Sequence, residues 1–301
     1  MTAGARYESD RSDGASPLPP SVLVGLIGKG IQNSRTPFMH ECEGARQGLR
    51  YVYKLLDTDM MGGTPPAIED ILAFARRFGF RGVNVTYPYK QAAIPHLDEM
   101  TADAAAVGAV NSVRFEDGRA IGHNTDMPAF AASFRQTLAG APHDTVLQLG
   151  AGGGGAAVAA ALLSSGVSAL LIHDIDPARA DQLAASLAAT FDKARVSTVP
   201  SAAEASARAD GIVNATPVGM ASLPGTAIDI GLVRPDMWVA DIVYFPLETE
   251  LLRLARAKGC RVMNGRGMAV HQAALAFDYF TGLSADVSAM GRDFDALSGG
   301  S

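Results

Sequence analysis

The sequence contains few cysteines and no cluster of basic residues. Its two cysteines, Cys42 and Cys260, lie far apart, which excludes a disulfide framework or a four-cysteine zinc site and is typical of a reducing compartment. Acidic residues outnumber basic ones by 31 to 25, and no run of Lys or Arg occurs. Because nucleic-acid-binding proteins usually carry a basic stripe, nucleic acid is not expected as a partner.

Targeting and membrane segments are also missing from the sequence. Residues 1–20 mix charges, serine and proline without an apolar stretch, so we expect an N-terminal tail and no secretory signal. The uncharged run Leu149–Ile172 is long enough for a membrane span, but glycine and serine interrupt it. A buried strand–helix–strand unit explains this run better. We therefore expect a cytoplasmic protein that does not contact a membrane.

Alternating strand-like and helix-like stretches begin at residue 21. This alternation predicts an α/β fold with mainly parallel sheets, and Asp117-Gly118 is typical of a tight hairpin turn. Apolar residues make up 48% of the chain, enough for sizeable cores. The sequence predicts a Rossmann-type dinucleotide-binding domain over residues 127–263, and a substrate-binding α/β domain over residues 21–126 and 264–290. A cleft would separate the two domains, and residues 291–301 would form a C-terminal tail.

A glycine-rich turn follows an apolar strand in the middle of the chain. Gly150, Gly152 and Gly155 fit the pattern G-x-G-x-x-G, and an alanine-rich helix follows them. Glycines let the backbone turn tightly and approach a pyrophosphate at the positive end of a helix. The pattern favours a dinucleotide held by Gly150, Gly152, Gly153 and Gly154, with a purely structural turn as the alternative.

Asp174 ends the next expected strand and bears on the choice of dinucleotide. A carboxylate there can accept hydrogen bonds from both hydroxyls of the adenosine ribose, and it would repel a 2′-phosphate. Arg179 is the only nearby cation. The sequence therefore favours NAD over NADP. In the alternative interpretation an aspartate caps the helix that begins at Pro177, a role that suits Asp176.

Polar residues gather at strand ends outside the nucleotide-binding stretch, where they predict a pocket for a hydroxylated, anionic small molecule. The candidates for its carboxylate are Ser34 and Thr36, and those for its ring hydroxyls are Thr86, Asn111 and Gln272. Lys90 beside Asp126 can exchange a proton with an alcohol as hydride leaves. Taken singly, each of these residues is more typical of a turn or cap. No metal site is expected, since His40-Glu41-Cys42-Glu43 lacks the spacing H-E-x-x-H.

Several motifs in this order resemble the shikimate dehydrogenases and the related quinate/shikimate dehydrogenases, over nearly all of Ser21–Gly282. The motifs that carry the resemblance are S-R-T-P at 34–37, N-V-T-Y-P-Y-K at 84–90, N-T-D at 124–126, N-A-T-P-V-G-M at 214–220 and G-R-G-M at 265–268.

The resemblance implies the role of each candidate residue. Lys90 and Asp126 would form the catalytic pair in the transfer of hydride between NAD and the C3 hydroxyl of quinate or shikimate. The product would be 3-dehydroquinate or 3-dehydroshikimate. The residues expected to contact the substrate are Ser34, Thr36, Thr86, Asn111, Tyr244 and Gln272. The later motifs would bind the cofactor through Thr216, Val218 and Gly265.

Two segments depart from the usual family pattern. Asp174-Ile175-Asp176 stands where NADP-dependent members usually have Asn-Arg-Thr, and Thr36 replaces a serine. Both departures resemble the NAD-dependent branch that also oxidises quinate. The alternatives are an NADP-dependent biosynthetic shikimate dehydrogenase, an aminoshikimate dehydrogenase and a non-catalytic metabolite-sensing homologue. The intact Lys90–Asp126 pair argues against the last of these, and a homodimer is compatible with the sequence.

Overall fold

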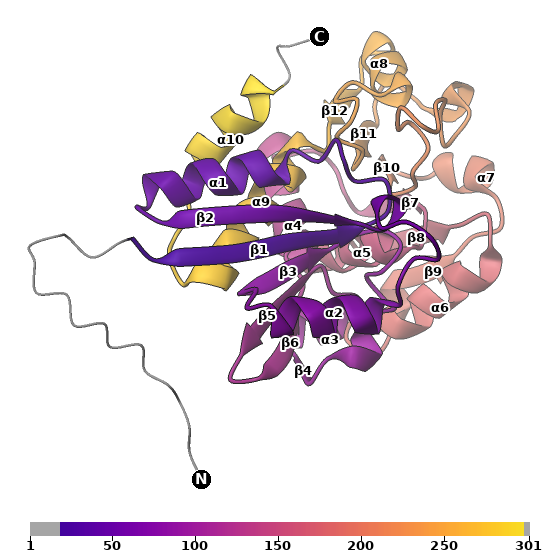
Figure 1. Ribbon diagram of the computed structural model, residues 1–301. Helices are drawn as coiled ribbons and strands as arrows, with labels where there is room; N and C mark the ends of the chain where they lie inside the picture. The colour runs from indigo at the N-terminus through magenta and orange to yellow at the C-terminus, as the bar shows by residue number, and fades with distance from the viewer. Residues whose placement is uncertain (1–18, 298–301) are drawn as a thin grey trace, which may run out of the picture.

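The computed structural model describes residues 19–297, in which two six-stranded sheets are surrounded by helices (Figure 1). The first sheet contains β1 (Ser21–Gly28), β2 (Arg50–Asp57), β3 (Gly82–Val85), β4 (Glu99–Met100), β5 (Ser112–Glu116) and β6 (Arg119–His123). The second contains β7 (Thr145–Leu149), β8 (Ala169–His173), β9 (Val196–Thr198), β10 (Gly211–Asn214), β11 (Trp238–Asp241) and β12 (Arg261–Met263).

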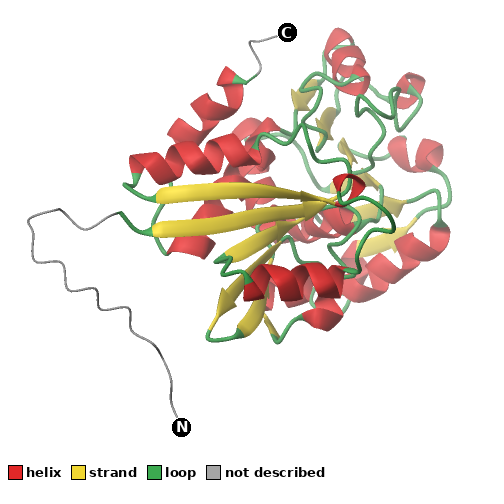
Figure 2. Ribbon diagram, in the orientation of Figure 1, coloured by secondary structure: helices red, strands yellow, loops and turns green. Residues whose placement is uncertain are grey.

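The helices of the described chain alternate with these strands, as the secondary-structure colouring shows (Figure 2). They are α1 (Thr36–Arg46), α2 (Ile68–Arg77), α3 (Ala102–Val107), α4 (Asp126–Thr137), α5 (Gly153–Ser164), α6 (Pro177–Leu187), α7 (Ala202–Ser206), α8 (Glu250–Ala257), α9 (Arg266–Thr281) and α10 (Val287–Ala296).

The second sheet is wholly parallel and has the order β12-β11-β10-β7-β8-β9. This order is that of a Rossmann-type domain, so the predicted fold class is confirmed. The buried cores place α5 and α6 on one face of the sheet and α7 and α8 on the other. The strand order reverses between β7 and β10. The glycine-rich turn follows β7 at this switch point, where α/β sheets bind their ligands.

The uncharged run Leu149–Ile172 forms the end of β7, the buried helix α5 and most of β8. The run is therefore the strand–helix–strand unit that the sequence predicts. No helix within residues 19–297 is long and apolar enough to cross a membrane.

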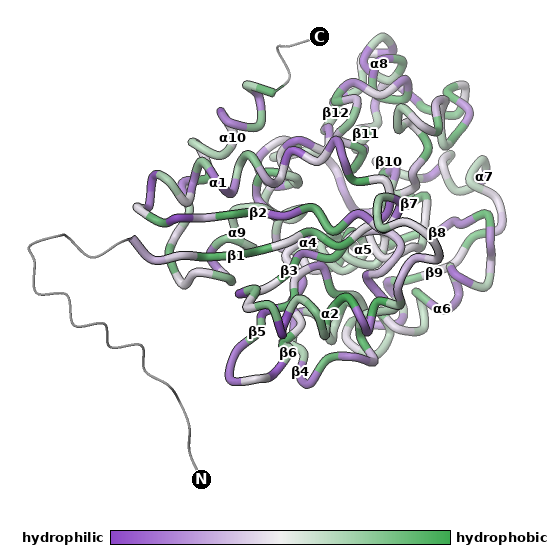
Figure 3. Tube along the Cα trace, in the orientation of Figure 1, coloured by the Kyte–Doolittle hydropathy of each residue, from purple (hydrophilic) through white to green (hydrophobic). Residues whose placement is uncertain are grey.

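The first sheet is mixed and has the order β2-β1-β3-β5-β6-β4. Strands β1, β2 and β3 are parallel, whereas β5 runs antiparallel to both β3 and β6. The β5–β6 hairpin turns at Asp117 and Gly118, whose φ angles of 50° and 76° confirm the predicted tight turn. Helices α2 and α3 cover one face, and α9 covers the other. The hydropathy colouring shows β1 as mostly hydrophobic between these layers (Figure 3).

Helix α4 links the two halves of the molecule, because it packs against both α9 and α5. Its sequence shows little amphipathic pattern, since residues on several of its sides are buried, among them Phe130 and Phe134. The sequence therefore does not predict this helix.

The strands of the two sheets span residues 21–123 and 145–263. The domain bounds at 126/127 and 263/264, and the cleft between the domains, stay predictions.

The C-terminal segment differs from the sequence-based expectation. Residues 291–301 are expected as a tail, but α10 extends to Ala296, so that expectation is wrong for residues 291–296. Met290 and Phe294 are fully buried against Met39 and Val270. These two side chains attach α10 to the rest of the protein. Residues 298–301 and 1–18 lie outside the described residues.

Truncating the anchor of α10 should destabilise the protein. Phe294→Ala removes a buried ring and leaves a cavity, so the free energy of unfolding should fall by about 3–5 kcal/mol. Leu297→Ala, at an exposed position just beyond the helix, should change it by less than about 0.5 kcal/mol. Urea unfolding of both variants checks this. Equal effects of the two substitutions would mean that α10 is not attached through Phe294.

Candidate active site

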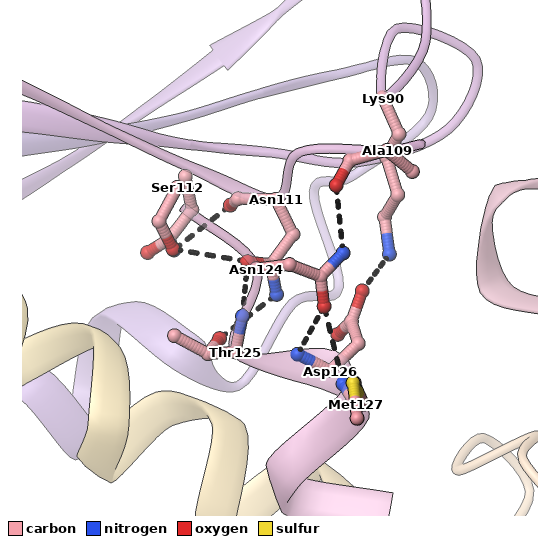
Figure 4. Close-up of polar contacts among 9 residues, drawn as sticks. Lys90, Ala109, Asn111, Ser112, Asn124, Thr125, Asp126 and Met127 are labelled. Atoms are coloured by element: carbon pink, nitrogen blue, oxygen red, sulfur yellow. Dashed lines mark hydrogen bonds and ion pairs between the residues drawn. The ribbon is translucent and has the colours of Figure 1, made fainter. Parts of the chain in front are cut away.

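Lys90 and Asp126 form an ion pair between the turn after β3 and the start of α4 (Figure 4). Lys90 Nζ donates to Asp126 Oδ2 at 2.5 Å, and the two side chains are only 18% and 7% exposed. The Lys90 main-chain carbonyl accepts from the Val110 amide at 3.0 Å, which holds this turn against the segment before β5. The structure brings the two predicted catalytic side chains together, and their catalytic role stays a prediction.

Asn124 holds Asp126 in place. The Asn124 Oδ1 accepts from the main-chain amides of Asp126 and Met127, at 3.0 and 3.1 Å, and Nδ2 donates to the Ala109 carbonyl at 2.9 Å. These bonds satisfy amides in the first turn of α4 that have no partner within the helix. The sequence places Asn124 only within the motif N-T-D, and the structure adds its function as a buried cap.

The predicted carboxylate-binding residues lie at the N-terminus of α1. Thr36 is the first residue of this helix, and its main-chain amide lies 3.4 Å from Ser34 Oγ. The positive end of the helix dipole favours an anion at this position. Arg35 adds a positive charge, which acts on the Tyr244 hydroxyl. The arrangement is therefore suited to an anionic group.

The remaining predicted substrate residues come from four separate elements. Thr86 follows β3, and its main-chain amide donates to the Ile27 carbonyl at 2.9 Å. Asn111 is buried directly before β5. Tyr244 follows β11, is 41% exposed and lies near enough to Asp126 to be affected by its charge. Gln272 lies on α9, and no hydrogen bond joins it to the Lys90–Asp126 pair in the described chain.

The glycine-rich turn approaches Lys90 directly. A Cβ atom at Gly155 would lie 2.4 Å from the Gly150 carbonyl oxygen, so this turn requires glycine. A Cβ atom at Gly153 would lie 3.3 Å from Lys90 Cβ. The N-terminus of α5, which begins at Gly153 after Gly152, therefore lies beside the catalytic candidate. A pyrophosphate fits a bare backbone of this kind at a helix N-terminus, and Gly154 extends that backbone into α5.

Asp174 lies directly after β8 and contacts the same turn. Its Oδ2 accepts from the Ala151 amide at 2.7 Å, and its Oδ1 accepts from the Asp176 amide at 2.9 Å. Each carboxylate oxygen has a second lone pair that remains able to accept a ribose hydroxyl. Asp176 accepts from the Ala178 amide at 3.1 Å, which confirms its interpretation as the cap of α6. Between them, Ile175 is 98% exposed.

The three later cofactor candidates lie on two loops of the second sheet. The Thr216 hydroxyl donates to Asn214 Oδ1 at 2.6 Å and accepts from the Val218 amide at 3.2 Å. The single proton of the Thr216 hydroxyl is thus used within the loop, so Thr216 helps to position Val218. Gly265 is the N-cap of α9 and lies close to the main chain of Val243.

Asp241, at the end of β11, is a buried residue that sequence reasoning missed. It accepts from Asn214 Nδ2 at 3.0 Å, the Val243 amide at 3.0 Å and Thr249 Oγ1 at 2.8 Å. Burial raises the pKa of its carboxyl from 3.8 to about 6, although these three donors act in the opposite direction. Asp241 therefore connects the Thr216 loop with the segment before Tyr244. An aspartate at a strand end is the only sequence signal for it.

Comparison with known proteins agrees with these features. A family model described as the shikimate dehydrogenase substrate binding domain matches residues 26–113. Another, described as the shikimate 5′-dehydrogenase C-terminal domain, matches residues 265–290. A quinate/shikimate dehydrogenase (NAD(+)) from Corynebacterium efficiens is 48% identical over 92% of this chain and 99% of its own length. The chain belongs to the shikimate dehydrogenase family.

Other members of this family differ in the cofactor named for them. A shikimate dehydrogenase (NADP(+)) from Streptomyces avermitilis is 50% identical over 93% of this chain and 97% of its own length. The solved structure of quinate dehydrogenase from Corynebacterium glutamicum in complex with NAD is 46% identical, with a TM-score of 0.87. The match covers 92% of this chain and 100% of the quinate dehydrogenase chain. Overall identity therefore does not decide between NAD and NADP, and individual residues must do so.

The raised pKa of Asp241 predicts a pH-dependent stability. The folded protein keeps the Asp241 proton up to about pH 6, whereas the unfolded chain releases it near 3.8, so the folded state binds more protons in this window. The stability contribution of Asp241 should therefore fall as pH rises from about 4 to 6 and stay constant above. Relative to Asp241→Asn, wild-type protein should lose about 3 kcal/mol of unfolding free energy between about pH 4 and pH 7.

Urea unfolding of both proteins at several pH values measures this difference. Because other carboxyls titrate in both proteins, only the difference between wild type and Asp241→Asn reports on Asp241. Two parallel stability curves would contradict the prediction.

Proposed function

We propose that the chain is an NAD-dependent quinate/shikimate dehydrogenase. It reversibly oxidises the C3 hydroxyl of quinate or shikimate, which gives 3-dehydroquinate or 3-dehydroshikimate. The observation that carries this proposal is the partly buried Lys90–Asp126 pair directly beside the glycine-rich N-terminus of α5. The names of the NAD-dependent relatives support the choice of substrate and cofactor.

Lys90 is the residue proposed to exchange a proton with the substrate hydroxyl. Asp126 Oδ2 holds Nζ at 2.5 Å and balances its charge, so the amine is positioned before the substrate arrives. The bound dinucleotide supplies the acceptor for hydride. The low exposure of both side chains limits access of water to the proton transfer.

The rest of the site binds and orients the acid. Ser34, Thr36 and the N-terminal end of α1 form the carboxylate end, with Arg35 adding positive charge. The residues proposed to contact the ring and its hydroxyls are Thr86, Asn111, Tyr244 and Gln272. Since these side chains come from both halves of the chain, substrate binding would join the two sheets across the site.

The residues after β8 favour NAD. Asp174 offers a carboxylate to the ribose hydroxyls next to the turn formed by Gly150, Gly152 and Gly154. The highly exposed Ile175 offers an apolar surface to the adenine ring and no cation to a 2′-phosphate. The second candidate is an NADP-dependent shikimate dehydrogenase, which the Streptomyces avermitilis relative favours and Asp174 opposes.

The oligomeric state of the enzyme and its cellular compartment also belong to the proposal. Cys42 and Cys260 are both free thiols, which agrees with a cytoplasmic enzyme. The association of two copies of this chain into a homodimer stays a prediction.

Removing the proposed proton-transfer group should separate binding from turnover. Lys90→Ala should lower kcat by a factor on the order of 10²–10⁴ with either acid, while the dissociation constants of acid and NAD change little. Lys193→Ala, an exposed lysine in the second half of the chain, serves as the matched control. Steady-state rates and calorimetric titrations measure both effects. Turnover by Lys90→Ala at more than about a tenth of the wild-type rate would contradict the assignment.

Exchange of the residues after β8 should change the cofactor. The double variant Asp174→Asn/Ile175→Arg removes the repelling carboxylate and adds a cation for the 2′-phosphate. Its ratio of kcat/KM for NADP over NAD should rise by more than about tenfold relative to wild type. Arg179→Ala, which removes only the exposed partner of Asp176, should leave the ratio unchanged. A larger effect from Arg179→Ala than from the double variant would contradict the account.

A further inference from the structure

A chain of buried hydrogen bonds runs beneath the proposed site, from β2 across β3 and β5 to the start of α4. Tyr53 Oη donates to Asn84 Oδ1 at 2.7 Å, and Asn84 Nδ2 donates to Ser112 Oγ at 2.9 Å. Ser112 Oγ donates to Asn111 Oδ1 at 3.2 Å, and Asn111 Nδ2 donates to Thr125 Oγ1 at 2.8 Å. All five residues are buried, and the end of the chain nearest Asp126 is visible in Figure 4.

Two main-chain groups set the direction of these bonds. The Thr125 amide donates to Asn111 Oδ1 at 2.8 Å, and the Asn111 carbonyl accepts from Asn84 Nδ2 at 3.2 Å. An amide N–H can only donate and a carbonyl can only accept, so neither asparagine side chain can be turned end for end. With Ser112 as a second donor, both lone pairs of Asn111 Oδ1 are occupied. Within the described part of the chain, the second N–H of Asn111 Nδ2 is therefore the only group of this side chain left to bind a ligand.

We propose that Ser112, Asn84 and Tyr53 are positioning residues, which present Asn111 to the substrate as a hydrogen-bond donor only. The inference rests on the proposed function, in which Asn111 contacts a ring hydroxyl. A hydroxyl or carbonyl oxygen offers a lone pair to this N–H. An ammonium group has three N–H donors and no lone pair, so a ring ammonium at that position would leave the Asn111 donor unpaired.

The consequence is a specificity for oxygen over ammonium at the ring position that Asn111 contacts. The buried positions of Asn84 and Ser112 mean that neither residue needs to contact the substrate to have this effect. The same chain fixes the main chain at Thr125, directly before Asp126.

Ser112→Ala removes one of the two donors to Asn111 Oδ1 without adding volume. The KM for quinate or shikimate should rise about three- to tenfold, while kcat and the KM for NAD change by less than about twofold. Ser206→Ala is the matched control, because Ser206 is similarly buried but donates to the Ala203 carbonyl within α7, a helix that covers the second sheet. An unchanged substrate KM in Ser112→Ala, or an equal rise in Ser206→Ala, would overturn the proposal.

A double-mutant cycle tests whether Ser112 acts through Asn111. In an Asn111→Ala background, Ser112→Ala should raise the substrate KM no further, because the side chain that it positions is gone. Fully additive effects would show that Ser112 acts independently and would overturn its positioning role.

An analogue with an ammonium in place of the ring hydroxyl should bind at least about tenfold more weakly to wild type than to Asn111→Asp, which offers an acceptor. Equal binding to both would contradict the donor-only assignment.

A pair of tyrosines provides a readout that needs no substrate. Tyr53→Phe removes the first donor of the chain, whereas Tyr51→Phe removes the neighbouring buried hydroxyl, which bonds His40 Nδ1. In protein labelled with ¹⁵N-asparagine, the side-chain resonances of Asn84 and Asn111 should shift in Tyr53→Phe and stay in place in Tyr51→Phe. The opposite pattern, or no shift in either variant, would overturn the proposal.

The two proposals fail in different ways. Wild-type protein that turns over neither acid would contradict the proposed function, while the resonances would still test the hydrogen-bonded chain. Active protein with unshifted resonances in Tyr53→Phe would contradict the chain alone.

Discussion

The ion pair between Lys90 and Asp126 is the contact on which the rest of the site depends. Two charged groups with little exposure are stable only when each has a partner in good geometry, so both side chains must be held in place. Asn124 and the packing of α4 hold Asp126, and the turn after β3 holds Lys90. The buried polar residues around the pair therefore hold its two charges in place, and in the proposed function they would also orient it for proton transfer.

The glycine-rich turn of the second sheet lies against Lys90, one member of this ion pair. Parallel strands of the second sheet direct the glycine-rich turn to the point where the strand order reverses, and Gly153 lets that turn approach Lys90. A side chain larger than hydrogen at Gly153 would push on the lysine. The proposed sites for hydride and proton transfer are thus brought together by backbone geometry, and side chains such as Ser34 and Tyr244 complete the site around them.

Short local signals made much of this arrangement predictable from sequence. The glycine spacing, the Asp117-Gly118 turn and the Lys90 and Asp126 motifs each reflect a requirement of the nearby backbone or chemistry. The sequence could not predict α4 or α10 in the same way, since α4 is buried on several sides and α10 buries only four of its residues, among them Met290 and Phe294. Asp241 and Ser112 were missed because their roles depend on partners that only the folded chain brings near.

The most direct test of the account is to measure initial rates of the purified wild-type protein with quinate and with shikimate, each with NAD and with NADP. The account predicts turnover of at least one of the two acids with NAD, and a lower kcat/KM with NADP. A preference for NADP of more than about tenfold would contradict the role of Asp174 and Ile175. No turnover of either acid with either cofactor would contradict the proposed function itself.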